Sequence, residues 1–356
     1  MFVGGEFYYD EKWQLDTPQD PSGGALFLNG GKACLTVIAD SLLDQGIDRV
    51  LLPAYLCPTI VDTLEGCELA CSYYRVHRDL SIDLDDLQHQ AVNSQAIYFI
   101  NYFGFQHSAA TRDFLAERQG EGWLLIEDNA LAGFPDETLG DYIFNSLRKL
   151  CPFDGGYLRS RFDLKPFVEH YHGMPNRRLP LIRAYRSGLA DYLFHGRGKR
   201  EQLVELYEQA EKIYAADRVV EGDEGERLGI ERLDWTAIRS LRRRNYDYLL
   251  SLLEGVEGIT PIFPALQEDN LPMGLPVYVS GVPRDWLFDE LGNAGIGLTV
   301  HWEGILSDAR LNGDKQAVEM AGNMLTLVID QRTSLKQLDY LTQKIRESLE
   351  SLKGNP

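Results

Sequence analysis

Two stretches near the middle of the chain end in residues that could do chemistry together. Leu124-Leu-Ile-Glu-Asp-Asn-Ala130 places Asp128 at the end of an apolar run, and the next apolar run, Tyr142-Ile-Phe-Asn145, is followed by Ser146 and Lys149. Short apolar runs predict buried strands, and α/β sheets bind their ligands beyond the carboxyl ends of the strands. We therefore expect the Asp128 carboxylate and the Lys149 amine to share one pocket.

A carboxylate and an amine in one pocket suit one kind of cofactor chemistry. The Asp128 carboxylate can hold a cationic ring nitrogen, and the Lys149 amine, with its pKa lowered by burial and nearby positive charge, can form a Schiff base. Those are the two tasks that pyridoxal 5'-phosphate requires of its protein. The pair predicts pyridoxal 5'-phosphate as the cofactor, and the alternative interpretation of Lys149 is an ordinary surface lysine.

The phosphate group of that cofactor needs a binding site of its own. Asn29-Gly30-Gly31-Lys32 leads directly into a helical pattern, so the backbone amides of a helix N-terminus can face the anion. The Lys32 ammonium would add a point charge, and Ser146 would add a hydroxyl from the other side. A Gly-Gly pair before a helix is more often a simple turn, so the prediction for Gly30 and Gly31 depends on the combination of motifs.

A sheet is needed to bring these residues together. Between residues 25 and 160, apolar runs alternate with helix-like stretches, which is typical of a sheet built by crossover connections. The expected strands are 49–53, 69–76, 96–101, 123–127, 142–145 and 156–159. The expected helices are 32–43, 59–65, 83–90 and 109–119. Runs that are apolar on both faces predict an α/β fold with helices on both sides of a mostly parallel sheet.

The second half of the chain has a different pattern. Apolar residues three and four apart predict that residues 163–254 are mainly helical. Three more strands and a terminal helix are expected at 277–281, 297–302, 324–329 and 334–352. We expect a division into an N-terminal segment, a large cofactor-binding domain and a small C-terminal α/β domain, at residues 1–24, 25–240 and 241–356.

Several charged residues have more than one interpretation. The basic cluster Arg242-Arg-Arg-Asn-Tyr246 is expected to be a solvated helix face that pairs with acids, with an anion site as the alternative. Asp223-Glu-Gly-Glu226 is expected to be an exposed connection. His301 lies in a strand-like run, where contact with a substrate and a hydrogen-bonded core position are both open. We take His301 and Arg148 as candidate substrate contacts.

The order of the motifs resembles one known family. A glycine-rich helix start, Glu-Asp at a strand end, Ser146-Leu-Arg-Lys149 and Asp154-Gly-Gly156 resemble the DegT/StrS family of fold-type I pyridoxal-phosphate enzymes, which contains the nucleotide-sugar aminotransferases. Pro53-Ala-Tyr-Leu-Cys-Pro58, Asn101-Tyr-Phe-Gly104 and the strand sequences near the end extend this likeness over most of the chain. The chain is identified as a divergent member of that family.

The resemblance implies a role for each motif. It makes Lys149 the lysine of the internal aldimine and the general base, and Asp128 the partner of the pyridine nitrogen. It makes Tyr55 the candidate to cover the cofactor ring, with core packing as the alternative for this side chain. The implied activity is transfer of an amino group to a nucleotide-linked keto sugar, in polysaccharide or secondary-metabolite biosynthesis. The resemblance also implies a homodimer.

Two departures from the family keep other functions open. Where the family usually has Gln or His three residues after the aspartate, this chain has Leu131, which cannot hydrogen-bond. The spacing from Ser146 to Lys149 is also shorter than is common in sugar aminotransferases. Sugar dehydration, chemistry on an amino acid, and a non-catalytic binding or assembly role on the same fold remain alternatives.

The overall composition limits the partners. The 356 residues carry 35 Lys and Arg against 54 Asp and Glu, a net charge of −19, which repels nucleic-acid backbones and anionic membranes. No run reaches the ~20 apolar residues of a membrane helix, and the first residues lack the pattern of a secretory signal, so we expect a cytoplasmic protein. The five cysteines are expected to be reduced thiols, and no metal site is expected.

Overall fold

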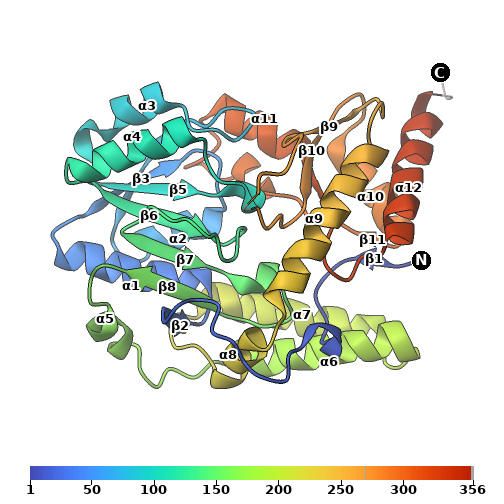
Figure 1. The fold of residues 1–356 in the computed structure, drawn as a ribbon, viewed down its shortest axis with the longest axis horizontal. Helices are drawn as coiled ribbons and strands as arrows, with labels where there is room; N and C mark the ends of the chain where they lie inside the picture. Colours follow the sequence, from blue (N-terminus) through green and yellow to red (C-terminus); the bar gives the residue numbers. More distant parts are fainter. Residues whose placement is uncertain (269, 354–356) are drawn as a thin grey trace.

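The computed structural model describes residues 1–268 and 270–353, and a seven-stranded sheet forms its centre (Figure 1). The strand order is β2-β8-β7-β6-β5-β3-β4. The strands are β2 (Leu26–Leu28), β3 (Arg49–Pro53), β4 (Ala70–Tyr74), β5 (Ala96–Ile100), β6 (Leu124–Asn129), β7 (Tyr142–Asn145) and β8 (Gly156–Ser160). The neighbours from β7 to β4 pair in parallel, whereas β8 runs antiparallel to β7 and β2. The predicted α/β fold with a mostly parallel sheet is confirmed.

Helices cover both faces of this sheet, which is why β5 and β6 are buried along their whole length. The crossover helices are α1 (Gly31–Asp44), α2 (Pro58–Glu65), α3 (Leu84–Gln90) and α4 (Ala109–Gly120). Figure 1 shows α3 and α4 on one side of the sheet and α1 on the other. The side chains of Asp83 and Ser108 accept hydrogen bonds from the first turns of α3 and α4. No side chain caps α1 in this way.

A second, smaller sheet lies in the C-terminal part. It is antiparallel, in the order β12-β10-β9. Its elements and the helices around it are α9 (Trp235–Leu252), β9 (Ile259–Pro261), β10 (Leu275–Val279), α10 (Arg284–Asn293), α11 (Lys315–Asn323), β12 (Met324–Leu327) and α12 (Leu335–Lys353). The predicted boundary between residues 240 and 241 falls inside α9. We keep the division into three parts as a proposal.

The first residues of the chain join the C-terminal part in a short parallel strand pair. β1 (Val3–Gly4) pairs with β11 (Ile296–Gly297), so the N-terminal segment joins the C-terminal part (Figure 1). The predicted strand over 297–302 is wrong, because regular pairing stops at Gly297. Beyond this point a single bridge connects Thr299 to Thr326 of β12. The chain is then free to turn toward the central sheet at Trp302.

A helical hairpin lies beside the central sheet. It consists of α6 (Arg178–His195) and α7 (Arg200–Ala216), is preceded by α5 (Lys165–Glu169), and is followed by α8 (Glu224–Glu231). Figure 1 shows α6 and α7 side by side along the edge where β2 and β8 lie, and we call them the α6–α7 hairpin. They pack on each other through Leu179, Ile182, Leu203 and Ala210. The prediction that this region is mainly helical is confirmed.

Two predictions about charged stretches are wrong at one charged residue each, Arg242 and Glu226, whereas Arg244 and Glu224 are exposed as expected. Arg242 is fully buried rather than on a solvated face, because its guanidinium donates to the backbone carbonyls of Pro272, Met273 and Leu150. Glu226 is 2% exposed rather than part of an exposed connection, since ion pairs hold it inside. The predictions relied on charge alone and so placed both side chains at the surface. Both can be buried because each has several polar partners in the interior.

Among the described residues, the cysteines form no disulfide and the helices include no candidate membrane span. All five cysteines are free thiols, as predicted. Within the described ranges, no helix combines the length and the apolar character needed to cross a membrane.

Candidate active site

Asp128 and Lys149 lie around one cavity at the carboxyl ends of β6 and β7. Asp128 pairs in register with Phe144 of β7, and β7 leads directly into Ser146 and a 3₁₀ turn, Leu147–Lys149. The cavity has a volume of about 670 Å³ including its open mouth. Of the residues predicted from the sequence, its lining includes Gly31, Lys32, Asp128, Ser146, Arg148 and Lys149. The structure thus brings six of the predicted residues together.

Asp128 is buried and only partly hydrogen-bonded. It is 4% exposed, and it accepts hydrogen bonds from the Tyr98 hydroxyl and, at 2.7 Å, from the backbone N–H of Ala130. Burial raises the pKa of the Asp128 carboxyl to about 6, although both hydrogen bonds act to lower it. At neutral pH the cavity therefore contains a carboxylate that a cationic partner would stabilise.

The pKa of the Lys149 ammonium is lowered, whereas that of the Asp128 carboxyl is raised. Burial lowers the pKa of its ammonium, and the positive charge of neighbouring Arg148 lowers it further. A lowered pKa increases the fraction of neutral amine, which is the nucleophilic and basic form. Lys149 is therefore prepared to form a Schiff base or to accept a proton.

The N-terminus of α1 also lines the cavity, next to Ser146. Gly30 precedes the helix with φ 113°, a conformation that favours glycine, and no side chain caps the first turn. A Cβ at Gly31 would come within 3.3 Å of the Cβ of Ser146, so glycine allows the close approach of the two elements. An uncapped helix N-terminus beside a buried hydroxyl is a fitting place for an anion.

Lys32 has a different contact from the one predicted. Its ammonium donates three hydrogen bonds, at 2.8–3.2 Å, to the backbone carbonyls of Tyr214, Ala215 and Asp217 at the end of α7. A cation at a helix C-terminus is favourable because it complements the helix dipole. The Lys32 side chain thus connects α1 to the α6–α7 hairpin, and its backbone N–H remains the candidate for phosphate binding.

The α6–α7 hairpin contributes to the cavity through Tyr214. This ring lines the cavity, and the guanidinium of Arg148 lies 4.3 Å from its centroid. Arg148 Nη1 also donates to both carboxylate oxygens of Glu211 at 3.1 and 3.3 Å. Arg148 is therefore oriented by one carboxylate and one aromatic face.

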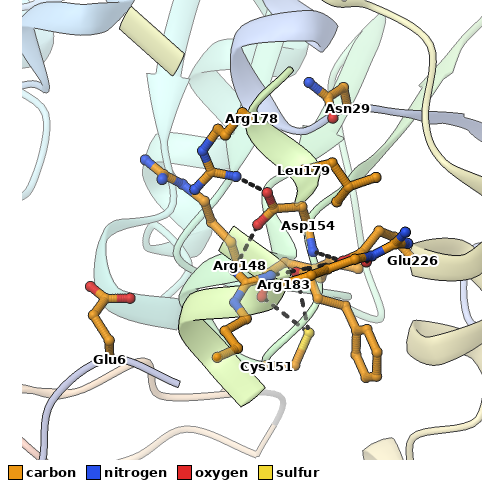
Figure 2. Close-up of polar contacts among 12 residues, drawn as sticks. Glu6, Asn29, Arg148, Cys151, Asp154, Arg178, Leu179, Arg183 and Glu226 are labelled. Atoms are coloured by element: carbon orange, nitrogen blue, oxygen red, sulfur yellow. Dashed lines mark hydrogen bonds and ion pairs between the residues drawn. The ribbon is translucent and has the colours of Figure 1, made fainter. Parts of the chain in front are cut away.

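Arg148 is the last member of a chain of ion pairs that reaches the cavity. Four acidic and four basic side chains alternate in this ion-pair chain: Asp223, Arg183, Glu226, Arg186, Asp154, Arg178, Glu211 and Arg148. Figure 2 shows Asp154 among them, with its carboxylate joined to Arg178 and its backbone N–H joined to Glu226. Each interior member has two opposite charges beside it.

His301 and Tyr55 lie behind the cavity wall and not in its lining. His301 Nδ1 is 2.9 Å from the Thr326 hydroxyl, and burial, with the charge of Lys149, lowers the pKa of His301 to about 3. Tyr55 is fully buried, and its hydroxyl donates to the backbone carbonyl of His301. Its ring packs 5.2 Å from that of Trp302. Their roles toward ligands stay predictions.

Four aromatic residues of the lining were not predicted from the sequence: Tyr98, Phe144, Tyr214 and Trp302. A signal existed for Tyr98, because it shares one face of a buried strand with Ile100 and its hydroxyl needs a buried partner. Trp302 is the last residue of the region predicted as a strand, and Tyr214 comes from the α6–α7 hairpin. Neither has a local signal, since distant segments bring them to the cavity.

Comparisons with known proteins give the fold. No protein-family model matches the chain, and no curated protein matches it in sequence. The structure of DesI in the presence of its TDP-sugar product is similar over 92% of this chain and 81% of DesI, with a TM-score of 0.67 and 16% identity. The E. coli GDP-4-keto-6-deoxy-D-mannose-3-dehydratase with bound hydrated PLP is similar over 91% and 88%, with a TM-score of 0.65 and 18% identity.

A third similar structure has the family name that the motifs suggested. It is a DegT DnrJ EryC1 StrS aminotransferase from Brucella abortus, similar over 91% of this chain and 85% of its own, with a TM-score of 0.63 and 16% identity. Identities this low establish a common fold. The chain therefore has the fold of the DegT-type, PLP-dependent sugar aminotransferases and dehydratases.

Proposed function

We propose that the protein is a pyridoxal-phosphate-dependent aminotransferase that acts on a nucleotide-linked keto sugar. The observation that carries the proposal is that Lys149, Asp128 and the uncapped N-terminus of α1 line one cavity. Similar structures include DesI in the presence of its TDP-sugar product, a putative sugar aminotransferase from Streptococcus pneumoniae, and a dehydratase named for a GDP-linked keto sugar. We further propose a place in amino-sugar synthesis for a polysaccharide or a secondary metabolite.

The residues present fit pyridoxal phosphate. Asp128 offers an under-bonded carboxylate for the ring nitrogen, and Gly31 and Ser146 stand at the anion-binding end. When bound, the cofactor supplies a cationic ring that withdraws electrons from the reacting carbon. The Asp128 carboxylate would keep a proton on the ring nitrogen. The neutral amine of Lys149 would accept the proton that leaves the carbon bearing the amino group, since its pKa is lowered.

An absorbance titration tests the cofactor assignment. Added pyridoxal phosphate is expected to give a Schiff-base band, and borohydride reduction followed by peptide mapping is expected to find the label on Lys149. Lys149→Ala should bind the cofactor without that band. If no band forms in cofactor excess, the catalytic proposal is wrong and a binding or assembly role on this fold becomes the better account.

A sugar dehydratase is the second candidate, because of Leu131. This side chain is 3% exposed and lines the cavity, where it offers no hydrogen bond to a cofactor or substrate. A TDP-linked keto sugar and ¹⁵N-labelled L-glutamate separate the two candidates. An aminotransferase places ¹⁵N in the sugar, whereas a dehydratase gives a nitrogen-free sugar that has lost water.

We propose that the protein works as a homodimer in the cytoplasm, without nucleic-acid or membrane partners. The net charge of −19 supports the last part, since it disfavours anionic surfaces. Light scattering of the eluting protein, with and without cofactor, measures the oligomeric state. A monomer at micromolar concentration in both conditions would contradict the dimer.

A further inference from the structure

We propose that the α6–α7 hairpin completes a phosphoryl-binding site within one chain, in which Arg148 binds the anion. The inference rests on the proposed function and deepens it. The site consists of the N-terminus of α1, Ser146 and Arg148, with Tyr214 and Glu211 as the residues that position Arg148. A phosphoryl group could belong to the cofactor or to a nucleotide-linked substrate, and the experiment below separates these sources.

The first argument is the incomplete bonding of Arg148. Only Nη1 of its guanidinium is bonded, to Glu211, and within residues 1–268 and 270–353 neither Nε nor Nη2 has a hydrogen-bond partner. The side chain lines the cavity and is 22% exposed. Two neighbouring N–H donors of one guanidinium match two oxygens of a phosphoryl group.

The second argument is the position of Arg148 in the ion-pair chain. Its neighbour Glu211 is shared with Arg178, whose Nη2 donates to it at 2.9 Å. Arg178 also pairs with a second acid, Asp154. Arg148 pairs with Glu211, and its other negative neighbour, Glu6, is more distant. The positive end of the chain is therefore the end that meets the cavity.

The third argument is the attachment of the hairpin beside the anion-binding helix. The Lys32 ammonium joins the start of α1 to the end of α7, and this places the Tyr214 ring in the cavity lining. Three cations surround that ring: Arg148, Arg178 and Lys32 lie 4.3, 5.1 and 5.7 Å from its centroid. An anion at the N-terminus of α1 would therefore lie near three cationic side chains, of which Lys32 and Arg178 are already bonded to oxygen atoms of the protein.

The direct test compares two ligands that differ by one phosphoryl group. Pyridoxamine 5'-phosphate and pyridoxamine form no Schiff base with Lys149, so their dissociation constants can be measured by calorimetry without covalent chemistry. In the wild type the phosphate is expected to tighten binding strongly. In Arg148→Gln the ratio of the two constants should fall about 30-fold, because two charge-assisted hydrogen bonds are lost. Arg148→Lys should retain part of the ratio.

Arg177→Gln is the matched control. Arg177 lies next to the same hairpin, but its side chain is 64% exposed and pairs with Asp217 outside the cavity. Its ratio should stay within twofold of the wild type. Damage to the fold would weaken both ligands together, so the ratio and not the constants is the readout. An unchanged ratio in Arg148→Gln overturns the inference if the binding of thymidine diphosphate, measured as described below, is also unchanged. Melting temperatures of the variants check that they fold.

Two further experiments are needed. The first distinguishes a phosphoryl group of the cofactor from one of the substrate, and the second distinguishes failure of this inference from failure of the proposed function. Thymidine diphosphate is titrated into protein saturated with pyridoxamine 5'-phosphate. A loss of its binding in Arg148→Gln, with the pyridoxamine ratio unchanged, assigns the site to the substrate. If the wild type binds neither pyridoxamine ligand, the proposed function is wrong. Inorganic pyrophosphate then tests the site alone, and the inference falls unless it binds the wild type and not Arg148→Gln.

Discussion

Two neighbouring carboxylates of β6 have opposite environments. Glu127 and Asp128 face opposite sides of the sheet because side chains alternate along a strand. Glu127 accepts four hydrogen bonds at 2.6–3.1 Å, from the side chains of Asn101 and Asn129 and from the backbone N–H groups of Leu139 and Gly140. Asp128 accepts only two and has a raised pKa. The protein itself therefore satisfies the Glu127 carboxylate, whereas the Asp128 carboxylate can still accept hydrogen bonds from a ligand.

The largest expected effect is the loss of activity in Asp128→Asn. The amide is nearly isosteric but cannot balance a protonated ring nitrogen, so turnover should fall about 10³-fold, or ~4 kcal/mol of transition-state stabilisation. Steady-state rates at saturating cofactor measure this. An Asp128→Asn variant with wild-type turnover would contradict the role of the carboxylate.

The next effect is expected in stability, at the neighbouring carboxylate. Glu127→Gln places an NH₂ group against either the amide donors of Asn101 and Asn129 or the backbone donors, so two buried donors lose their acceptor. The unfolding free energy should fall by about 3 kcal/mol. Urea denaturation of the cofactor-free protein measures this. A variant as stable as the wild type would mean that Glu127 is not the structural member of the pair.

Asp128→Asn should have the opposite effect on stability in the cofactor-free protein. The folded-state pKa of about 6 lies above the ordinary value of an aspartate, so the folded protein binds this proton more tightly and loses stability as pH rises from about 4 to 6. Above pH 6 the charge costs roughly 3 kcal/mol, which asparagine avoids. The variant should therefore be more stable than the wild type at pH 8 and no more stable near pH 4. Urea unfolding at both pH values tests the sign.

The sequence predicted the features that depend on local pattern. β3 and β7 have the expected bounds, and the strand ends correctly placed Asp128 and Lys149 on one cavity. This succeeded because an apolar run and the residue after it are local features, and the topology of parallel sheets gathers strand ends on one edge. The antiparallel edge strand β2 was missed, since three residues carry too little pattern.

The features that depend on distant partners could not be predicted. Arg242 looked like a surface residue because its acceptors are backbone carbonyls of two loops far away in sequence. Tyr214 reaches the cavity only because Lys32 holds the end of α7. Side-chain type gives no information about such contacts, which the tertiary structure alone creates.

The smallest expected effect concerns the hydroxyl that bonds to Asp128. The hydrogen bond from Tyr98 lowers the pKa of the Asp128 carboxyl and partly offsets burial. Tyr98→Phe should therefore move this pKa upward by about one unit, ~1.4 kcal/mol. The fall in stability of the cofactor-free protein with rising pH should extend to about pH 7 instead of about 6.

Tyr74→Phe is the matched control for this last comparison. Tyr74 is equally buried, and its hydroxyl donates at 2.9 Å to the backbone carbonyl of Tyr98 rather than to Asp128. Its removal should lower stability by a similar amount at every pH and leave the midpoint of the pH dependence in place. If both variants shift the midpoint equally, general loosening of β5 and not the hydroxyl sets the pKa of Asp128. If the midpoint shifts in Tyr98→Phe alone, the Tyr98 hydroxyl of β5 lowers the pKa of Asp128 in β6 and so keeps this carboxylate charged for its ligand.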